Sequence, residues 1–263
     1  MQAPKRVAVA GATGRVGRHV VDVLEARGHD AVPISRSQGV DVITGEGLDE
    51  ALVGVHALVD AATGPSPEQD AATAFFTTAA RNLQTAGTKS GVQRIVVVSI
   101  IGTDRFPVGY GAAKLAHEEV SLAGPVPARV LRAAQFHEFV QQMVDWGRNG
   151  EVSYVPKMRT QLVAARVVAE KLADMATDAE SEVPCGIPEI AGPREERLGE
   201  AASLLVARRG DPIRIESVSD PSDPMSELYE SGALLPGRDA TLAGPTFGEW
   251  LASEYPQGGR QAA

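Results

Sequence analysis

Short apolar segments alternate with amphipathic, helix-like segments along the first half of this chain. The plainest apolar segment is RIVVVSI at residues 94–100, which is rich in β-branched residues and has no polar face. A strand of this kind needs cover on both sides, as in a parallel sheet that has helices packed against each face. The alternation therefore predicts an α/β protein built on a doubly wound parallel sheet.

The same pattern places the individual elements of that sheet. We expect strands at Lys5–Ala10, His29–Ile34, Val40–Ile43, Val55–Asp60, Arg94–Ile100 and Ala128–Ala134. We expect helices at Val16–Arg27, Leu48–Val53, Glu68–Thr88, Tyr110–Leu122 and Phe136–Arg148.

Proline and glycine punctuate the second half of the chain, and the alternation is less regular there. We expect a helix within residues 161–179, a strand at 189–193, a helix at 195–210, a strand at 212–218, a helix at 246–255 and a frayed tail at 256–263. We therefore divide the chain into a sheet-forming core at residues 1–155 and a second part at residues 156–263. The second part adds the remaining sheet elements and a small α+β lobe to the same structural unit.

Composition excludes several classes of protein. The formal net charge is −9, from 34 acidic and 25 basic residues, so the surface repels nucleic-acid backbones. No apolar run is long enough for a transmembrane helix, and the chain enters its first strand within five residues, so we expect neither a membrane span nor a signal peptide. The single cysteine, Cys185, excludes an internal disulfide framework and fits a reducing cytoplasm. The five histidines show no close-spaced pairing, so we expect no metal site.

Three glycines mark the junction between the first strand and the first helix, within RVAVAGATGRVGRHVVDVLEARG at residues 6–28. Such a triplet allows a tight turn, a close approach of backbone to a pyrophosphate, and close packing of the helix on the strand. The N–H groups and the positive dipole end of the helix then bind the phosphates. We therefore expect a Rossmann-type site for a dinucleotide. Its loop contacts would come from Gly11, Thr13, Gly14, Arg15, Val16 and Gly17.

The end of the second strand indicates which dinucleotide is bound. Chains that bind NAD tend to carry an acidic residue there to bind the ribose 2′-hydroxyl, but this chain has Ser35 and Arg36. A guanidinium can form paired hydrogen bonds with a 2′-phosphate, which a carboxylate would repel. We therefore expect NADP(H) in preference to NAD(H), with Ser35 and Arg36 as contacts.

Several motifs occur in the order seen in short-chain dehydrogenases/reductases. They are GATGRVGRHVV, HALVDAAT, RIVVVSIIGTD, YGAAK and VLRAAQFHEF. More narrowly, the chain resembles the atypical, NmrA-like branch of that superfamily, which includes isoflavone-reductase-like proteins. Its C-terminal stretches resemble those of small bacterial members, so the resemblance covers nearly the whole chain. It implies a Rossmann fold that binds NAD(P).

Tyr110 and Lys114 match the Tyr-x-x-x-Lys pair that carries the proton chemistry in active members of the superfamily. A spacing of four places both side chains on one helical face. A tyrosine of ordinary pKa needs a nearby cation to act as an acid or base at neutral pH, and Lys114 can lower its pKa and also bind the ribose. By the same resemblance Ser99 would polarise the substrate oxygen, with Thr103 as a second candidate if Ser99 is buried. Ser99 and Tyr110 are slightly closer together than usual, and the NmrA-like branch often lacks the tyrosine.

Two further segments are assigned to the cofactor by the resemblance. Ala61, Ala62 and Thr63 correspond to the stretch that passes beside the adenine and its ribose. Ala134, Gln135 and Phe136 follow the sixth expected strand, where the family packs backbone against the nicotinamide. Phe136, His137 and Phe139 would then face the substrate, and His137 is either a proton donor or a hydrogen-bonding residue at a helix start.

Together these features predict an NADP(H)-dependent oxidoreductase that acts on a small or medium carbonyl, enone or quinone-like compound. We expect a cytoplasmic monomer or homodimer with no nucleic-acid or membrane partner. A regulator that senses NADP(H) without catalysis is the alternative, because NmrA-like proteins include such sensors. An enzyme that holds NADP(H) without net turnover also stays open. A nucleotide-sugar epimerase fits less well, since the C-terminal lobe is short for a bulky sugar nucleotide.

Overall fold

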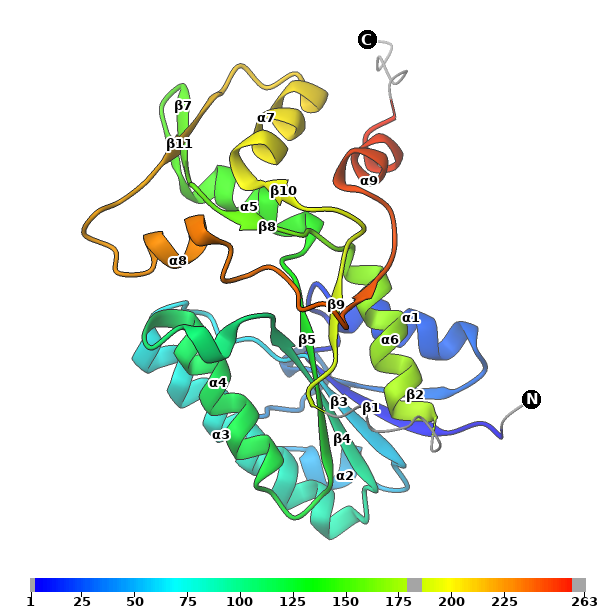
Figure 1. Cartoon of the computed structure of the whole chain (residues 1–263). Helices are drawn as coiled ribbons and strands as arrows, with labels where there is room; N and C mark the ends of the chain where they lie inside the picture. The colour runs from blue at the N-terminus through cyan, green and yellow to red at the C-terminus, as the bar shows by residue number, and fades with distance from the viewer. Residues whose placement is uncertain (1–2, 179–185, 257–263) are drawn as a thin grey trace. The chain divides into compact units, whose positions relative to one another are not determined.

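The structure is a computed structural model that describes residues 3–178 and 186–256. Cys185 and all but the first residue of the expected C-terminal tail lie outside the described residues. The chain forms two compact units (Figure 1). The first unit consists of Met1–Arg132 and Ala165–Pro188, and the second unit consists of Ala133–Ala164 and Glu189–Ala263. The borders between the units thus follow residues 132, 164 and 188, whereas the sequence predicts one border at residue 155.

The strands of the first unit are β1 (Arg6–Ala10), β2 (Asp30–Ile34), β3 (Ala57–Asp60), β4 (Arg94–Ile100) and β5 (Ala128–Ala133), the last of which ends at the border of the unit. Its helices are α1 (Gly17–Ala26), α2 (Leu48–Ala51), α3 (Gln69–Ser90), α4 (Gly109–Leu122) and α6 (Ala165–Thr177), with short 3₁₀ turns η1 (Arg36–Gln38) and η2 (Thr103–Arg105). The order in the central parallel sheet is β12-β9-β5-β4-β3-β1-β2, in which β9 (Glu189–Ala191) and β12 (Thr241–Leu242) come from the second part of the chain. This is the predicted Rossmann-type α/β fold.

Helices cover both faces of the sheet in the first unit. Figure 1 shows α3 and α4 on one face and α1 and α6 on the other, and each pair packs together. Every residue of β3 and all but the first of β1 are buried, as the apolar sequences of these strands predict. The chain pairs β1 with β2 on one side and then crosses to pair β3 on the other side. The carboxyl ends of β1 and β3 therefore border the switch point at which open α/β sheets bind their ligands.

The strand expected at Val40–Ile43 does not form. The carboxylate of Asp41 accepts hydrogen bonds from the backbone N–H of Ile43 at 2.6 Å and of Thr44 at 3.4 Å. A side chain that bonds its own backbone in this way makes a turn and removes the donors that a sheet ladder needs. β2 is therefore the edge strand of the sheet.

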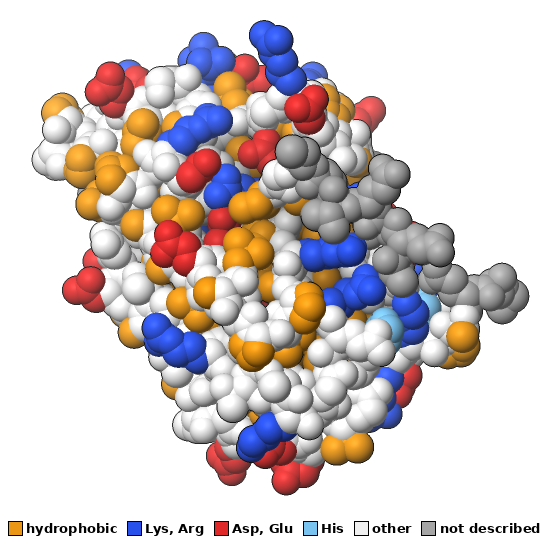
Figure 2. Space-filling model, turned by 60° about the horizontal axis from the view of Figure 1, so that its bottom comes forward, with side chains coloured by type: hydrophobic (Ala, Val, Ile, Leu, Met, Phe, Trp, Pro, Cys, Tyr) orange, Lys and Arg blue, Asp and Glu red, His pale blue; other side chains and the backbone are white. Residues whose placement is uncertain are grey.

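Basic side chains bind the C-terminal end of α6. The Arg94 guanidinium donates to the carbonyl oxygens of Met175 and Asp178, and the Lys5 ammonium donates to that of Thr177. Figure 2 shows Lys, Arg and His side chains gathered on the face of the molecule at which the strands begin. Burial and then the charges of Lys5 and Arg94 lower the pKa of His56, which belongs to the same cluster. These cations complement the carbonyl end of the helix dipole and attach α6 to the sheet.

The second unit contains α5 (His137–Trp146), β6 (Arg148–Asn149), β7 (Val152–Pro156), β8 (Arg159–Thr160), β9, β10 (Glu196–Arg197), α7 (Leu198–Arg209), β11 (Arg214–Val218), α8 (Ser226–Ser231), β12 and α9 (Phe247–Glu254). A small sheet of order β11-β7-β6 has β11 parallel and β6 antiparallel to β7, and β8 pairs with β10. The expected elements at α7, β11 and α9 are present. The sequence pattern missed the short strands β6, β8, β10 and β12, the strand β7 and the helix α8. No helix among the described residues is long and apolar enough to cross a bilayer.

His137 lies in an aromatic cluster of the second unit, with its ring centroid 5.5 Å from that of Phe247 and 5.2 Å from that of Trp250. Its backbone N–H donates to the carbonyl of Val163, and its Nε2 lies 3.2 Å from the carbonyl oxygen of Pro245. The side chain is buried, and burial lowers its pKa to about 4. The imidazole is therefore neutral at pH 7, with Nε2–H as the donor to Pro245.

Replacement of His137 by Asn should make the protein less sensitive to acid. The unfolded chain binds a proton at the ordinary histidine pKa, but the folded protein does so only near pH 4, so the stability that depends on a neutral His137 is present above pH 6.5 and is lost as the pH falls. Between pH 7 and pH 5 this difference amounts to at most about 2 kcal/mol. Urea unfolding at the two pH values should show a smaller loss in the variant by that amount. An equal loss in both proteins would contradict the assignment.

Candidate functional site

The glycine loop connects β1 to α1 at the carboxyl edge of the sheet. Gly11 has a φ of +74°, and the N–H groups of Gly11 and Ala12 donate to the carbonyl of Ile34 at 3.1 and 3.3 Å. The N–H of Gly14 donates to the carbonyl of Gly11 at 2.8 Å, which closes the turn. The loop is thereby fixed to the end of β2.

Backbone contacts exclude side chains at two of the three glycines. A Cβ on Gly11 would lie 2.6 Å from the carbonyl oxygen of Ala61, and a Cβ on Gly17 would lie 2.1 Å from that of Gly11. Gly14 is exposed, and its Cβ would lie 3.0 Å from the same Gly11 oxygen. Gly11 therefore packs the loop against the segment that follows β3, and Gly17 packs α1 against the loop.

The amino end of α1 is open to an anion. Its N-cap, Val16, makes no side-chain capping bond, and the first turn of the helix contains no acidic residue. Thr13, Gly14 and Arg15 are exposed beside it. The first N–H groups of a helix have no partner within the helix, and the helix dipole adds positive potential there. The amino end of α1 therefore offers backbone N–H donors beside the exposed Arg15. No carboxylate in the first turn of the helix competes with an anion there.

Ser35 and Arg36 lie directly after β2, as the sequence predicts. Arg36 begins η1 and is exposed, and no ion pair joins it to any acidic side chain that the structure describes. The hydroxyls of Ser35 and Ser37 are 2.9 Å apart. The end of β2 thus combines two hydroxyls with a guanidinium that has no acidic partner among these residues.

Tyr110 is directed at the segment after β3. Its hydroxyl is hydrogen-bonded to the side chain of Thr63, and its ring meets the edge of Phe76 at a centroid distance of 5.7 Å. Burial raises the pKa of Tyr110, although the bond to Thr63 opposes the shift. The phenol therefore stays protonated at neutral pH.

Lys114 is buried one helical turn away and contacts other groups. Its Nζ lies 2.8 Å from the carbonyl oxygen of Val98, 3.0 Å from Nδ1 of His117, and 4.4 Å from the ring centroid of Phe76. Burial lowers the pKa of Lys114 to about 8, against the opposing charges of Asp60 and Glu118. Burial and Thr63, and not Lys114, set the pKa of Tyr110 in this structure, so the role of Lys114 in lowering that pKa stays a prediction.

The two candidate hydroxyls near the end of β4 differ in their partners. The Ser99 side chain is buried, and its Oγ has no hydrogen-bond partner among the described residues. The hydroxyl of Thr103 lies 3.1 Å from the carbonyl oxygen of Ile100 and 3.2 Å from the carboxylate of Glu118. Arg132 also binds Glu118, with Nη2 at 2.8 Å from Oε2. Thr103 thus belongs to a hydrogen-bond network that holds the turn after β4, whereas the hydroxyl of Ser99 has no partner among the described residues.

Ala134, Gln135 and Phe136 belong to the second unit, where α5 begins directly after them. The side chain of Gln135 accepts a hydrogen bond from the hydroxyl of Thr160 at 2.6 Å, and its carbonyl accepts one from the N–H of Val163 at 3.0 Å. Phe136 forms a parallel bridge with Val163. Contacts within the second unit therefore fix this segment.

Sequence reasoning missed two residues that the structure brings to Lys114. Asp60 ends β3, and its carboxylate lies 2.9 Å from Nε2 of His117 and accepts the N–H of Ala62 at 3.1 Å. His117 follows Lys114 by three residues, a spacing that places them on one helical face. The spacing of three residues could have indicated that His117 lies beside Lys114. The pairing with Asp60 could not be predicted from it, because Asp60 belongs to a strand far away in the sequence.

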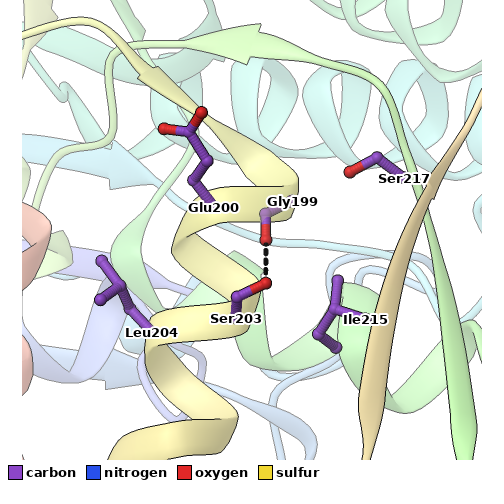
Figure 3. A pocket seen from close by; sticks show the side chains of 6 residues that line it. All are labelled: Gly199, Glu200, Ser203, Leu204, Ile215 and Ser217. Atoms are coloured by element: carbon purple, nitrogen blue, oxygen red, sulfur yellow. Dashed lines mark hydrogen bonds between the residues drawn. The ribbon is translucent and has the colours of Figure 1, made fainter.

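A separate cavity of about 600 Å³ lies between α7 and β11 in the second unit. Its lining consists of Gly199, Glu200, Ser203, Leu204, Ile215 and Ser217. Figure 3 shows the Ser203 hydroxyl directed back to the carbonyl of Gly199, and Ile215 and Ser217 projecting from the strand opposite. None of the predicted site residues lines this cavity. No group of three or more His, Cys, Asp or Glu side chains within the described residues could hold a metal ion.

Residues 11–124, which include the glycine loop, Arg36, Tyr110 and Lys114, match the family of NAD(P)H-binding domains. A comparison with curated proteins by sequence finds no match.

Solved structures resemble this chain over almost its whole length. They include a UDP-N-acetylglucosamine 4-epimerase from Bacillus cereus (18% identity, TM-score 0.66, 95% of each chain covered). A short-chain dehydrogenase/reductase superfamily protein from Agrobacterium tumefaciens with bound NAD is similar (17%, 0.67, 95% of each chain). An NADPH-dependent quinone oxidoreductase from Escherichia coli also matches (17%, 0.63, 95% of this chain and 99% of that one). The chain therefore shares the fold of these three proteins.

Replacement of Gly17 by Ala should disrupt the glycine loop. The new methyl group would collide with the Gly11 carbonyl, so the free energy of unfolding should fall by about 1–3 kcal/mol. Gly248→Ala is the matched control, because Gly248 also lies near the start of a helix and a Cβ there meets nothing within 4 Å. The control should leave stability unchanged or raise it by about 0.5–1 kcal/mol. Urea unfolding followed by circular dichroism measures both, and equal stabilities would argue against the steric constraint.

Proposed function

We propose that the chain is an NADP(H)-dependent oxidoreductase that reduces a small or medium carbonyl, enone or quinone-like compound. The observation that carries the proposal is the uncapped amino end of α1 behind the exposed Thr13-Gly14-Arg15 loop. This arrangement lies at the switch point of the sheet, inside a segment that matches NAD(P)H-binding domains. We also retain the expectation of a cytoplasmic monomer or homodimer.

The residues of the first unit fit the parts of such a cofactor. The amino end of α1 would supply backbone N–H groups for the pyrophosphate, since anions are favoured at a helix start. Arg36 and Ser35 supply a positive charge and a hydroxyl for a 2′-phosphate, and no acidic residue stands at that position to repel it. The backbone of Ala61 and Ala62 lies against Gly11, and the segment Ala61–Thr63 would border the adenosine. These assignments favour NADP(H) over NAD(H).

The proton chemistry follows from the protonation state of Tyr110. A reduced nicotinamide, when bound, would supply a hydride to the substrate carbon. The substrate oxygen then needs a proton, and a phenol that burial keeps protonated can donate it to a far more basic alkoxide. The unpartnered hydroxyl of Ser99 can hydrogen-bond the same oxygen. Hydride and proton together convert a C=O group to CH–OH.

The E. coli neighbour is described as an NADPH-dependent quinone oxidoreductase, which supports this class of substrate. The second candidate function is an NADP(H) sensor that binds the dinucleotide without turnover. The contacts of Lys114 favour this alternative, because its ammonium is engaged by Val98 and His117 and not by Tyr110.

Titration of the purified protein with NADPH, NADP⁺, NADH and NAD⁺ tests the proposal first. NADPH should bind at least about tenfold more tightly than NADH, a difference of about 1.4 kcal/mol. Arg36→Ala should remove most of this preference and leave the affinity for NADH nearly unchanged. Arg166→Ala is the control, since it removes an equal charge from an exposed pair with Glu170 outside residues 11–124. If none of the four nucleotides binds, the proposed function fails.

The Tyr110→Phe variant distinguishes the enzyme hypothesis from the sensor hypothesis. The variant removes the proton donor but keeps the ring that packs on Phe76, so the affinity for the dinucleotide should change less than about twofold while turnover falls by about 10²–10⁴. A screen of carbonyl and quinone compounds with NADPH oxidation as the readout supplies the substrate. Full activity in the variant would refute the role of Tyr110. Tight NADPH binding with no turnover of any compound would favour the sensor.

A further inference from the structure

A chain of three buried polar side chains lies beside the proposed cofactor site. Asp60 contacts Nε2 of His117 at 2.9 Å, and Nδ1 of His117 contacts Nζ of Lys114 at 3.0 Å. The exposed fractions of Asp60, His117 and Lys114 are 1%, 1% and 5%, so water does not screen these contacts. The ring of His117 also stacks on Phe76, with 4.9 Å between centroids. We propose that His117 is a positioning residue that holds Lys114 in place and is itself oriented by Asp60.

The geometry determines where the protons lie. The carboxylate of Asp60 only accepts hydrogen bonds, so Nε2 of His117 must carry the proton that joins them. A neutral imidazole then has a lone pair at Nδ1, and this lone pair faces the Lys114 ammonium. Burial alone would raise the pKa of Asp60, but His117 and the N–H of Ala62 bring it below its usual value. Burial and the charge of Lys114 lower the pKa of His117, which keeps the ring neutral.

The surroundings of Lys114 make this positioning necessary. Lysine has a flexible four-carbon stem and three donors, so a single partner does not fix its ammonium group. Val98 of β4 offers a carbonyl, Phe76 of α3 offers a ring face, and His117 of α4 offers the nitrogen acceptor. The other charges that act on Lys114 are those of Asp60 on β3 and Glu118 on α4, and Arg132 on β5 pairs with Glu118. Among the described residues, Lys114 has two hydrogen-bond acceptors, of which only His117 is a side chain.

These contacts, called the Asp60–His117–Lys114 relay below, also reach the segment after β3. Asp60 accepts the N–H of Ala62, and the next residue, Thr63, bonds Tyr110. Loss of His117 would therefore disturb both Lys114 and the loop that packs against Gly11. This inference rests on the proposed function, because Lys114 and the segment Ala61–Thr63 are assigned to the cofactor site.

The protonation state of His117 is measured without any cofactor. Long-range ¹H–¹⁵N spectra of the five histidines, assigned with His117→Asn, should show His117 as the neutral Nε2–H form from pH 8 to pH 5.5. Lys114→Met should shift the Nδ1 resonance of His117 and leave its Nε2–H form unchanged, because only the Lys114 contact is lost. A His117 ring protonated on Nδ1, or one that titrates at the ordinary histidine pKa, would overturn the proposal.

A pair of variants tests the positioning itself. The amide oxygen of His117→Asn can replace Nδ1 as the acceptor for Lys114, whereas His117→Ala removes it, and both variants reduce the volume of the side chain. His117→Ala should weaken NADPH binding by about tenfold, as expected for one lost hydrogen bond to a charged group. His117→Asn should lose less than about threefold. Equal losses in the two variants would mean that His117 only fills space.

The two proposals fail separately. If wild-type protein binds no dinucleotide, the proposed function fails, and the histidine spectra of the wild type and of Lys114→Met still decide the relay. If NADPH binds but His117 carries its proton on Nδ1, the relay fails and the cofactor assignment stands. Circular dichroism identifies any variant that does not fold, and the wild-type spectra keep the proposal open to refutation in that case.

Discussion

The contact of backbone with backbone at Gly11 and Gly17 is the constraint on which the candidate site depends. Each glycine lies so close to a carbonyl oxygen that a methyl group would collide with it. These contacts bring the end of β1, the start of α1 and the segment after β3 together, and the bonds to the Ile34 carbonyl add the end of β2. Buried polar groups are then supplied by α4, which brings Tyr110 to Thr63 and His117 to Asp60. The edge of the sheet is therefore organised before any ligand arrives.

Electrostatics divides this edge into two kinds of environment. Arg15 and Arg36 are exposed, so their charges attract an anion through a screened field. Lys114 and Asp60 are buried, where charges interact strongly and also cost more to desolvate. The neutral ring of His117 separates these two charges and gives each a hydrogen-bond partner. The exposed arginines can therefore attract a ligand, and the buried side chains of Asp60, His117 and Lys114 hold one another in fixed positions.

Local sequence pattern predicted those elements whose formation depends on local properties. The apolar run at Arg94–Ile100 became β4 with the same bounds, because its Ile and Val residues favour a covered strand. The strand at Val40–Ile43 failed because the side chain of Asp41 competes for the backbone, and the short strands β8 and β10 are too brief to show a period. The environment of Lys114 could not be predicted, since Asp60 and Phe76 reach it only after β3 and α3 have packed. A residue type and a spacing locate a candidate, but the partners that set its pKa come from tertiary packing.

The placement of α6 has a consequence for synthesis of the protein. This helix lies in the first unit, packs against α1, β3 and β4, and is attached through its end to Lys5 and Arg94. Its residues nevertheless follow the stretch 133–164, which belongs to the second unit. While a nascent chain emerges from the ribosome, the part of one sheet face that lies beside α1 stays uncovered until residue 177 has left the exit tunnel. Apolar surface at β3 and β4 is thus exposed for a defined interval of translation.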